Sequence, residues 1–461
     1  MPKLTLGRSP RRRARWPLLL PIVAIVAVAM WGALRRGPAP AIVIETDRPA
    51  IGTATKVTAR FSEPSRGLGS IRLELVQGDK TVVLAERRFE RSGAYALLRG
   101  PSTPTADLEA AVGRSTQAWL TEGEVVLRAT ADRMAGPLRS HALVVVEKRV
   151  AVRLRPPRLE LLSKQHYVRQ GGSGVVLLRI GETATRSGVR AGSVESLSFP
   201  LPGGGPGERF VLYAVPWELD DVGQIRAFAE DDAGNRAELP YVDLFKKSPP
   251  RADKLDLIDD FLAKVVPAIA SQTPGFDTSG SLLDQYLRIN GDQRRAILAR
   301  IAEIAKDTEH AFLWRGAFMQ MTNTQRRAGF AETRTYAYHG QPVDHQTHLG
   351  LDLASTEHAP VPAANAGRVV FAGWLVIYGN AVIIDHGYGL MSLYGHMSAL
   401  AVKPGDVVAK GQTIGNSGAT GLAGGDHLHL EIFVQGKSVD PFEWLDEHWI
   451  RDNVATKVTL P

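Results

Sequence analysis

The 461-residue sequence contains no cysteine. This absence excludes disulfide frameworks and metal sites built from thiolates, although it does not define the compartment in which the protein works. Any metal ion must therefore be held by histidine and carboxylate side chains.

Acidic residues are absent from the first 36 positions, which hold eight Lys and Arg. The rest of the chain holds 47 basic and 48 acidic residues, so the net charge of +7 comes from the first 36 positions. A nucleic-acid-binding protein needs a basic face on a folded domain. The nearly neutral remainder shows no such excess, and we predict no nucleic-acid partner.

A single long stretch, residues 16–34, carries no charge over 19 residues. As a helix it would span about 28 Å, close to the hydrocarbon thickness of a bilayer. Basic residues are denser before it than after it, which predicts a cytoplasmic tail (1–15), an inner-membrane anchor (16–36) and an extracytoplasmic, periplasmic remainder. The alternative is a cleaved signal peptide, for which Ala39-Pro40-Ala41 is a weak cleavage site.

Two β domains are expected after this segment. Apolar residues alternate with polar ones in short runs such as 71–75, and Gly, Pro and Ser separate the runs. The string at 127–136 recurs 98 residues later at 225–234, a period that suits an immunoglobulin-like sandwich. We therefore predict Ig-like β-sandwiches at 42–150 and 151–247, with one larger β domain as the alternative.

The apolar period changes to that of a helix between residues 253 and 321. Leu257, Phe261 and Val265 follow this spacing, and Asp292 suits the start of a second helix. We predict a helical linker segment at 250–330 that packs against or spaces the neighbouring domains. A C-terminal antiparallel β domain is expected at 331–450.

Nine of the twelve histidines lie after residue 331, and two motifs stand out among them. One is His348-Leu-Gly-Leu-Asp352, and the other is His427-Leu-His429-Leu-Glu431. Alternate residues of a strand share a face, so His427 and His429 point the same way. Two imidazoles and one carboxylate would leave a tetrahedral zinc ion (Zn²⁺) with an open position for a water of lowered pKa.

The order of the motifs resembles that of the lysostaphin-type, or LytM-like, zinc metalloendopeptidases. The HxxxD motif precedes the strand string at 380–386, then Tyr394-Gly395-His396, then the HxH motif after a glycine-rich stretch at 418–425. The resemblance covers about a quarter of the chain, roughly residues 336–444. It implies a zinc peptidase that hydrolyses peptidoglycan.

Carried over from that family, His348, Asp352 and His429 are the expected zinc ligands. His427 and His396 are the expected catalytic pair, of which one activates water and the other stabilises the oxyanion. The sequence does not distinguish their roles. No position of the five is lost, as it is in family members that only activate other hydrolases.

Other polar residues receive weaker predictions. Glu431 either orients an imidazole or faces solvent, and Asn380 either braces the site or occupies a turn. Asn323 is a candidate to plug the fourth zinc position, as in latent relatives. The remaining histidines of this region are expected to be structural or at the surface: His339, His345, His358 and His386.

Three rival interpretations follow from the same residues. The string at 402–412 resembles biotin- and lipoyl-carrier domains, but no lysine lies between Gly367 and Ala401 to carry the group. A catalytically silent activator or scaffold of another cell-wall hydrolase is the main alternative. A secreted lytic protease requires cleavage of the N-terminal segment.

We thus expect a mainly β, multidomain, membrane-anchored metalloendopeptidase of peptidoglycan cross-links. Its partners are stem peptides, with the D-Ala–diaminopimelate bond favoured, the inner membrane through residues 16–36, and a candidate regulatory protein bound by the Ig-like domains.

Overall fold

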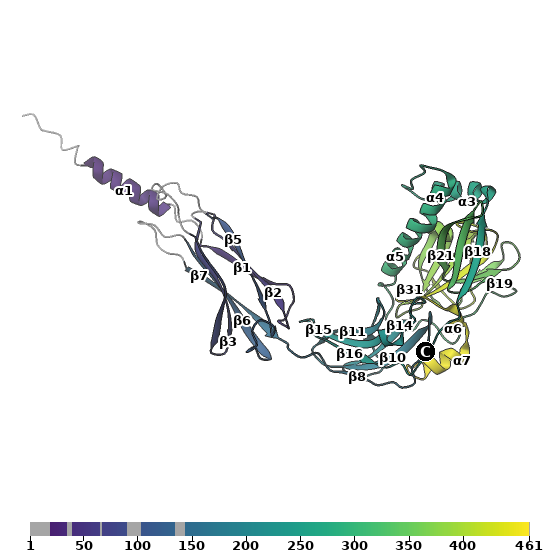
Figure 1. Cartoon of the computed structure of the whole chain (residues 1–461), viewed down its shortest axis with the longest axis horizontal. Helices are drawn as coiled ribbons and strands as arrows, with labels where there is room; N and C mark the ends of the chain where they lie inside the picture. Colours follow the sequence, from purple (N-terminus) through teal and green to yellow (C-terminus); the bar gives the residue numbers. More distant parts are fainter. Residues whose placement is uncertain (1–18, 35–38, 65–66, 90–102, 134–142, 461) are drawn as a thin grey trace, which may run out of the picture. The chain divides into compact units, whose positions relative to one another are not determined.

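The computed structural model describes residues 19–34, 39–64, 67–89, 103–133 and 143–460. Helix α1 (Leu19–Leu34) comprises 16 uncharged residues (Figure 1). Within the described ranges, no helix combines the length and the apolar character that crossing a membrane requires. The predicted anchor at 16–36 stays a prediction, and its ends, like the predicted tail at 1–15, lie outside the described residues.

The chain divides into two compact units. One comprises residues 1–155 together with 232–235, and the other comprises residues 156–231 and 236–461. The domain boundaries predicted from sequence stay predictions, but the second unit joins the β domain after residue 156 to the C-terminal domain.

The first unit contains two antiparallel sheets, ordered β1-β2-β5 and β4-β3-β6-β7. They enclose a core that includes Phe61, Leu73 and Leu127, which are all fully buried. This packing follows from the alternating burial along β2, in which every second residue faces inward. The strands are β1 (Ala41–Thr46), β2 (Thr55–Ser62), β3 (Leu68–Gln77), β4 (Lys80–Arg88), β5 (Thr105–Val112), β6 (Gly123–Arg133) and β7 (Leu143–Val152).

The second unit begins with two four-stranded sheets, ordered β13-β14-β10-β8 and β12-β11-β15-β16, and a small parallel pair, β9 and β17. The repeated string lies on β6 in the first unit and on β15 here, and each strand pairs with two neighbours in its sheet. The strands are β8 (Leu159–Leu161), β9 (Tyr167–Arg169), β10 (Ser173–Ile180), β11 (Ala184–Ala191), β12 (Val194–Leu197), β13 (Phe199–Pro200), β14 (Glu208–Ala214), β15 (Ile225–Asp231), β16 (Arg236–Pro240) and β17 (Leu244–Lys246).

The predicted helical linker contains a strand as well as helices. Strand β18 (Arg251–Leu257) pairs in parallel with β20 (Glu332–Tyr338) and so belongs to the C-terminal domain. Helix α3 (Asp259–Gln272) follows, and α4 (Leu282–Arg288) continues through a π turn (Ile289–Gln293) into α5 (Arg294–Ile304). Asp292 therefore lies inside the π turn instead of starting a helix.

The C-terminal domain is built on a large sheet ordered β19-β22-β30-β26-β25-β24-β28, with β31 beside β30. Two three-stranded sheets complete it, β18-β20-β21 and β23-β29-β27. Its further strands are β19 (Gln325–Ala328), β21 (Gln341–His348), β22 (Leu351–Ala354), β23 (Pro360–Pro362), β24 (Gly367–Trp374), β25 (Asn380–Asp385), β26 (Leu390–Met397), β27 (Ala399–Leu400), β28 (Val407–Val408), β29 (Thr413–Asn416), β30 (Leu428–Val434) and β31 (Lys437–Val439). Short helices α6 (Pro441–Leu445) and α7 (Glu447–Ile450) follow.

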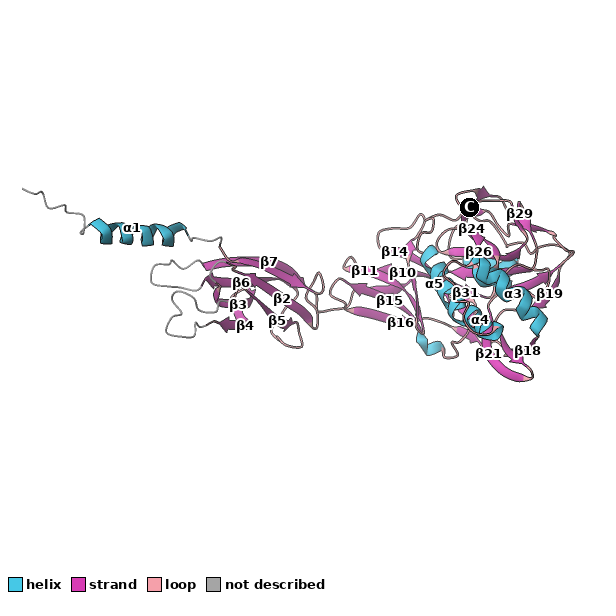
Figure 2. Cartoon of the chain, turned by 90° about the horizontal axis from the view of Figure 1, so that it is seen from above, coloured by secondary structure: helices cyan, strands magenta, loops and turns pink. Residues whose placement is uncertain are grey.

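The large sheet is buried on both faces. Helices α3, α4 and α5 cover one face (Figure 2), where Ile269 and Ile301 pack in one cluster with Leu393 of β26. On the other face, Trp314 and Trp444 meet at 5.5 Å between ring centroids, in a cluster with Leu430 of β30. Burial on both faces fits the unbroken apolar run at 381–384 of β25. The fold is mainly β, as predicted.

The β domain after residue 156 shares a core with the C-terminal domain. Phe210 of β14 packs edge-on against Tyr388 at 4.8 Å and lies 5.6 Å from Phe312, ring centroid to ring centroid. Ser173 donates two hydrogen bonds, from its backbone nitrogen and its hydroxyl, to Oε2 of the buried Glu443 on α6. This domain is thus packed into the second unit through both apolar and polar contacts.

Glu443 makes this packing sensitive to pH. Burial, together with the nearby Asp440 carboxylate, raises the pKa of Glu443 to about 8 from its usual 4.5. Between pH 4.5 and about 8, Glu443 is protonated in the native state but ionised in the unfolded chain. The free energy of unfolding therefore decreases as the pH rises through this window. We expect Glu443→Gln to flatten the pH dependence of the melting temperature, measured below and above the window. A slope equal to that of the wild type would contradict this assignment.

Candidate metal centre and active site

The three predicted ligands come from three strands that meet at one edge of the cavity. Asp352 on β22 lies directly opposite His429 on the antiparallel neighbour β30. His348 ends β21, which belongs to a different sheet. The HxxxD segment is not one extended strand, because the chain turns at Leu349-Gly350 between β21 and β22. The turn, and not a shared strand face, brings His348 to Asp352.

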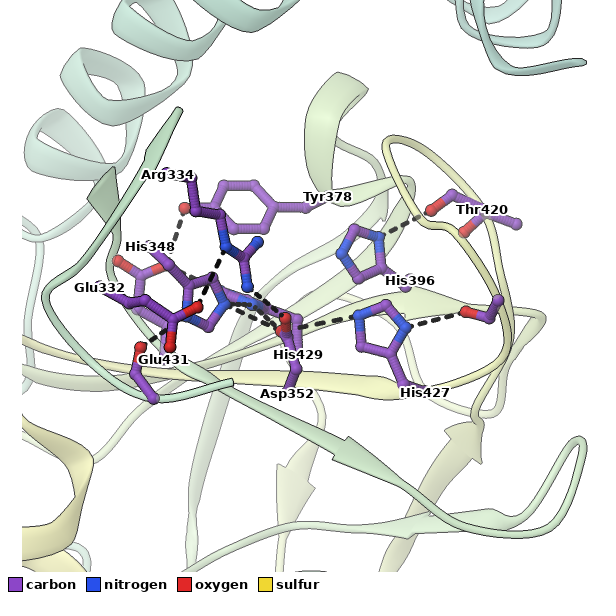
Figure 3. A network of polar contacts seen from close by, with 12 residues as sticks. Glu332, Arg334, His348, Asp352, Tyr378, His396, Thr420, His427, His429 and Glu431 are labelled. Atoms are coloured by element: carbon purple, nitrogen blue, oxygen red, sulfur yellow. Dashed lines mark hydrogen bonds and ion pairs between the residues drawn. The ribbon is translucent and has the colours of Figure 1, made fainter. Parts of the chain in front are cut away.

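The ligand atoms converge closely. Asp352 Oδ1 lies 2.9 Å from His348 Nε2 and 2.9 Å from His429 Nδ1, and the two nitrogens are 3.1 Å apart (Figure 3). All three residues are buried. Within the described residues, they form a cluster of histidine and carboxylate groups that could hold a metal ion.

The hydrogen bonds around this cluster fix which atoms face inward. His348 Nδ1 donates to the Gly329 carbonyl oxygen at 2.8 Å, so its Nε2 offers a lone pair. His429 Nε2 faces Glu431 Oε2 at 3.3 Å, so its Nδ1 offers another. Two nitrogen lone pairs and a carboxylate oxygen repel one another at this spacing unless a cation lies between them. The donor set fits a tetrahedral zinc ion with one position left open.

The charge around these ligands also favours a cation. Burial would by itself raise the pKa of Asp352, but the neighbouring imidazoles of His348, His427 and His429 hold it well below its usual range. Burial likewise opposes a charge on His429, yet the Asp352 and Glu431 carboxylates raise its pKa to about 9. Burial lowers the pKa of His348. The low pKa of Asp352 keeps a negative charge among the three donor atoms, which suits a bound cation.

Gly350 is required by the close packing of this centre. A Cβ atom at this position would lie 2.7 Å from both Cε1 and Nε2 of the His429 ring. No real Cβ contact is that short, so any larger residue would displace the imidazole. The glycine of the HLGLD motif thus has a steric role that the sequence analysis did not assign.

His396 and His427 form a pair beside the ligands. Their ring centroids are 4.7 Å apart, and His427 Nε2 lies 3.6 Å from Asp352 Oδ1. His396 Nδ1 donates to the Thr420 carbonyl and His427 Nδ1 to the Gly425 carbonyl, both at 2.8 Å. When either ring is neutral, this tautomer leaves Nε2 as its acceptor. Burial lowers the pKa of His396 well below its usual value. The pair can accept and return protons.

His396 has a backbone conformation that non-glycine residues rarely adopt, with φ of 62°. Such strain is concentrated at functional sites, where the surrounding structure holds it. Here Gly395 pairs with His429 across β26 and β30, and Asn380 of β25 donates to the carbonyl oxygen of the neighbouring Met397 at 3.2 Å. Asn380 therefore braces the strand end that presents His396.

Glu431 is fully buried and not solvent-facing. It accepts a hydrogen bond from Tyr378 Oη at 2.7 Å and another from Ser438 Oγ, and it faces Nε2 of His429. These contacts hold the carboxylate in place, so that it orients the His429 ring toward the other ligands. Glu431 is a positioning residue of this centre.

Replacing Glu431 with glutamine is expected to weaken zinc affinity about 10- to 100-fold, because the neutral amide no longer orients and polarises His429. Competition with a zinc chelator measures this affinity. Glu303→Gln, at an exposed glutamate of α5, is the matched control. Equal affinities in the two variants would remove the assigned role.

A cavity of about 360 Å³ opens over all five residues. Its other lining includes Leu257 of β18, Phe261 of α3, Arg294 of α5, and Arg334 and Tyr336 of β20. The predicted linker segment therefore contributes a wall of the cavity. Figure 3 shows the ligands with Arg334 and Glu332 on one side and His396 and His427 on the other.

The other candidate residues lie outside this cavity. Asn323 is exposed, and its carbonyl accepts a hydrogen bond from Ser355, so the structure does not place it at the metal centre. Three of the remaining histidines are exposed: His339, His345 and His358. His386 is buried and bonded to the Ala366 carbonyl and to Ser392, and burial lowers its pKa to about 4.

The sequence analysis missed Arg334, Tyr378 and Thr420 as site residues. No local pattern distinguishes them, since Arg334 is one of many arginines and Thr420 acts through its backbone carbonyl. Tyr378 directly precedes Gly379-Asn380, and this turn pattern is the feature of the sequence that could have drawn attention to it.

Comparison with known proteins agrees with this geometry. Residues 346–441 match the family described as Peptidase family M23. DD-carboxypeptidase/endopeptidase Mpg from Neisseria meningitidis serogroup B is 39% identical over 108 residues, 23% of this chain and 25% of that protein. Murein hydrolase activator EnvC from Escherichia coli is 41% identical over 96 residues, 21% of this chain and 23% of that protein.

Among solved structures, a putative peptidase M23 from Pseudomonas aeruginosa is 19% identical with a TM-score of 0.38, covering 62% of this chain and 96% of that one. Because residues 346–441 match the model of Peptidase family M23, the C-terminal part of the chain is a peptidase M23 (LytM-like) domain, as the sequence motifs predicted. The chain matches only about a quarter of the length of these two curated relatives.

Proposed function

We propose that this protein is a zinc metalloendopeptidase that hydrolyses peptide cross-links of peptidoglycan. The observation that carries the proposal is the convergence of His348, Asp352 and His429 within 3.1 Å, with the His396–His427 pair beside them at one cavity. The name of Mpg, a DD-carboxypeptidase/endopeptidase, supports the type of reaction.

His348, Asp352 and His429 would hold the zinc ion through Nε2, Oδ1 and Nδ1. Zinc bound there supplies a Lewis acid for activating water and polarising a carbonyl group. The chain's own residues define the proton pathway. Nε2 of either His396 or His427 accepts a proton from the attacking water, because each Nδ1 proton is already held by a backbone carbonyl.

The second imidazole of the pair, when protonated, donates to the oxygen of the carbonyl under attack. The two rings lie close enough to exchange these roles, and the geometry does not separate them. The apolar wall formed by Leu257, Phe261 and Tyr336 limits the access of bulk water to this reaction.

The setting of the enzyme is also part of the proposal. Residues 16–36 would anchor the protein in the inner membrane, with the M23 domain in the periplasm. The favoured scissile bond is that between D-Ala and diaminopimelate. The uncharged run at 16–34 and the basic residues around it support the anchor.

The second candidate function is a catalytically silent activator of another hydrolase, and the similarity to EnvC favours it. Zinc content and cross-link cleavage of purified sacculi distinguish the two. One zinc ion per chain, together with conversion of cross-linked stem peptides in the sacculi into uncross-linked ones, supports the enzyme. A wild-type chain that carries no zinc and leaves the sacculi intact supports the activator.

A further inference from the structure

Arg334 presents a guanidinium group beside the metal ligands. It lies on β20, its side chain is 17% exposed, and it lines the cavity. Its Nη2 donates to Asp352 Oδ2 at 3.1 Å, which is the carboxylate oxygen that does not face the imidazoles. Arg334 therefore lies next to the metal centre without competing for a ligand atom.

The hydrogen-bond capacity of Arg334 is largely unused. A guanidinium group has five N–H donors. Among the described residues, Arg334 makes one hydrogen bond, through Nη2, while Nε stands 3.5 Å from Glu332 Oε1 and is buried without a hydrogen-bond partner. If Arg334 only neutralised Asp352, most of its N–H donors would have no hydrogen-bond partner. The Nη atoms have the geometry to bind a planar anion in the cavity.

A second arginine adds positive charge to the same cavity. Arg294 of α5 also lines it, and Asn290 holds its guanidinium through its backbone carbonyl and side-chain oxygens, at 3.1 and 2.6 Å. Among the cavity-lining residues that the segment 250–330 contributes, Asp256 is acidic. The lining of the cavity therefore carries two guanidinium groups.

We propose that Arg334 binds a free carboxylate of the substrate, the one on the residue that supplies the scissile nitrogen. This proposal rests on the proposed peptidase function. A substrate bound in this way would have its scissile carbonyl between the metal centre and the histidine pair and its leaving half toward Arg334, which donates to the expected ligand Asp352 at 3.1 Å. The carbonyl carbon and the α-carboxylate carbon of the next residue are three bonds apart, about 3 to 4 Å.

Substrate chemistry separates two classes of cross-link at this position. In a D-Ala–diaminopimelate link, the residue that supplies the nitrogen bears a free α-carboxylate beside the scissile bond. A glycine inside a Gly–Gly bridge bears none, because its carboxyl is itself in an amide bond. Arg334 would therefore select links with the adjacent carboxylate.

Equilibrium binding tests the proposal without turnover. The full chain, loaded with zinc and carrying His427→Ala, is titrated with two synthetic peptides that contain an acyl-D-Ala–diaminopimelate link. In one peptide the carboxyl next to the scissile nitrogen is free, and in the other it is a carboxamide. We expect the free carboxylate to bind about 10- to 100-fold more tightly.

Adding Arg334→Met should abolish this preference and leave carboxamide binding nearly unchanged, while Arg334→Lys should restore part of it. Arg327→Met, at an exposed arginine of β19 outside the cavity, should keep the preference. Zinc content and melting temperature confirm that each variant is folded and loaded.

Three results would overturn the proposal: equal affinities of the parent for both peptides, no binding of either, or an equal loss for both peptides on Arg334→Met. The last result would show that Arg334 only supports Asp352. Failure of the proposed function appears separately, as absence of cleavage by the chain in which His427 is intact.

Discussion

Replacing His427 with alanine is expected to lower kcat for cross-link cleavage by about 10²- to 10⁴-fold while zinc remains bound. The reason is that His427 contributes proton transfer, which has an effect of this size, and its Nε2 lies 3.6 Å from Asp352 Oδ1 without completing the ligand set. Cleavage of defined cross-linked peptides and metal analysis of the purified protein measure the two quantities.

His429→Ala is the matched comparison, two residues away. It removes one of three ligands that lie within 3.1 Å of one another, so both zinc and cleavage should be lost. The contrast between the two variants assigns the roles that the motif alone leaves open. Loss of zinc in His427→Ala, or retention of zinc in His429→Ala, would reverse the assignment.

Replacing Phe210 with alanine is expected to lower the free energy of unfolding of the second unit by about 3 to 5 kcal/mol, the usual cost of removing a buried aromatic ring. Phe210 belongs to a β domain distant in sequence from the metal centre, yet it packs against Tyr388 and Phe312 in the core of the M23 domain. Thermal unfolding monitored by calorimetry, together with zinc retention on heating, measures the effect.

Phe61→Ala provides the control, because Phe61 is equally buried but has its contacts in the core of the first unit. It should destabilise that unit by a similar amount and leave zinc retention and cleavage unchanged. If Phe210→Ala behaves in the same way as Phe61→Ala, the β domain after residue 156 is only a spacer and not part of the folded unit that carries the site.

The two predictions together define how the protein should be divided in experiments. A fragment that starts at residue 331 would lack β18, which pairs with β20, and the helices that cover one face of the large sheet. It would also expose Tyr388, because the aromatic rings that pack against it, among them Phe210 and Phe312, precede residue 331. A fragment that starts near residue 156 keeps all these contacts.

The most specific predictions of the sequence analysis came from short motifs. HxxxD, HxH and the Tyr-Gly-His string identified five residues that the structure places at one cavity. Alternation of apolar residues predicted a mainly β chain, and helical spacing located α3 and α5. Motif spacing and apolar periodicity depend only on residues near one another in the sequence, so they can be recognised without knowledge of the fold.

The sequence analysis failed where the answer depends on contacts between distant segments. The segment 250–330 was expected to be a helical linker, but β18 completes a sheet and lines the cavity. No periodicity in seven residues reveals a parallel pairing with a strand 81 positions later, as in Arg251 with Glu332. Asn323 was a candidate plug for the metal on sequence position alone, yet it lies at the surface.

The metal centre shows most clearly what the sequence determined by itself. It specified the donor types, because a chain without cysteine can offer only imidazole and carboxylate to a metal. The resemblance of its motifs to those of LytM-like peptidases predicted His348, Asp352 and His429 as the ligands. Tertiary structure decided which atoms face inward. The carbonyl of Gly329 and the carboxylate of Glu431 hold the outer nitrogens of the two imidazoles, and Arg334 engages the outer oxygen of Asp352. Such choices depend on hydrogen-bond partners that only folding brings within 3.3 Å.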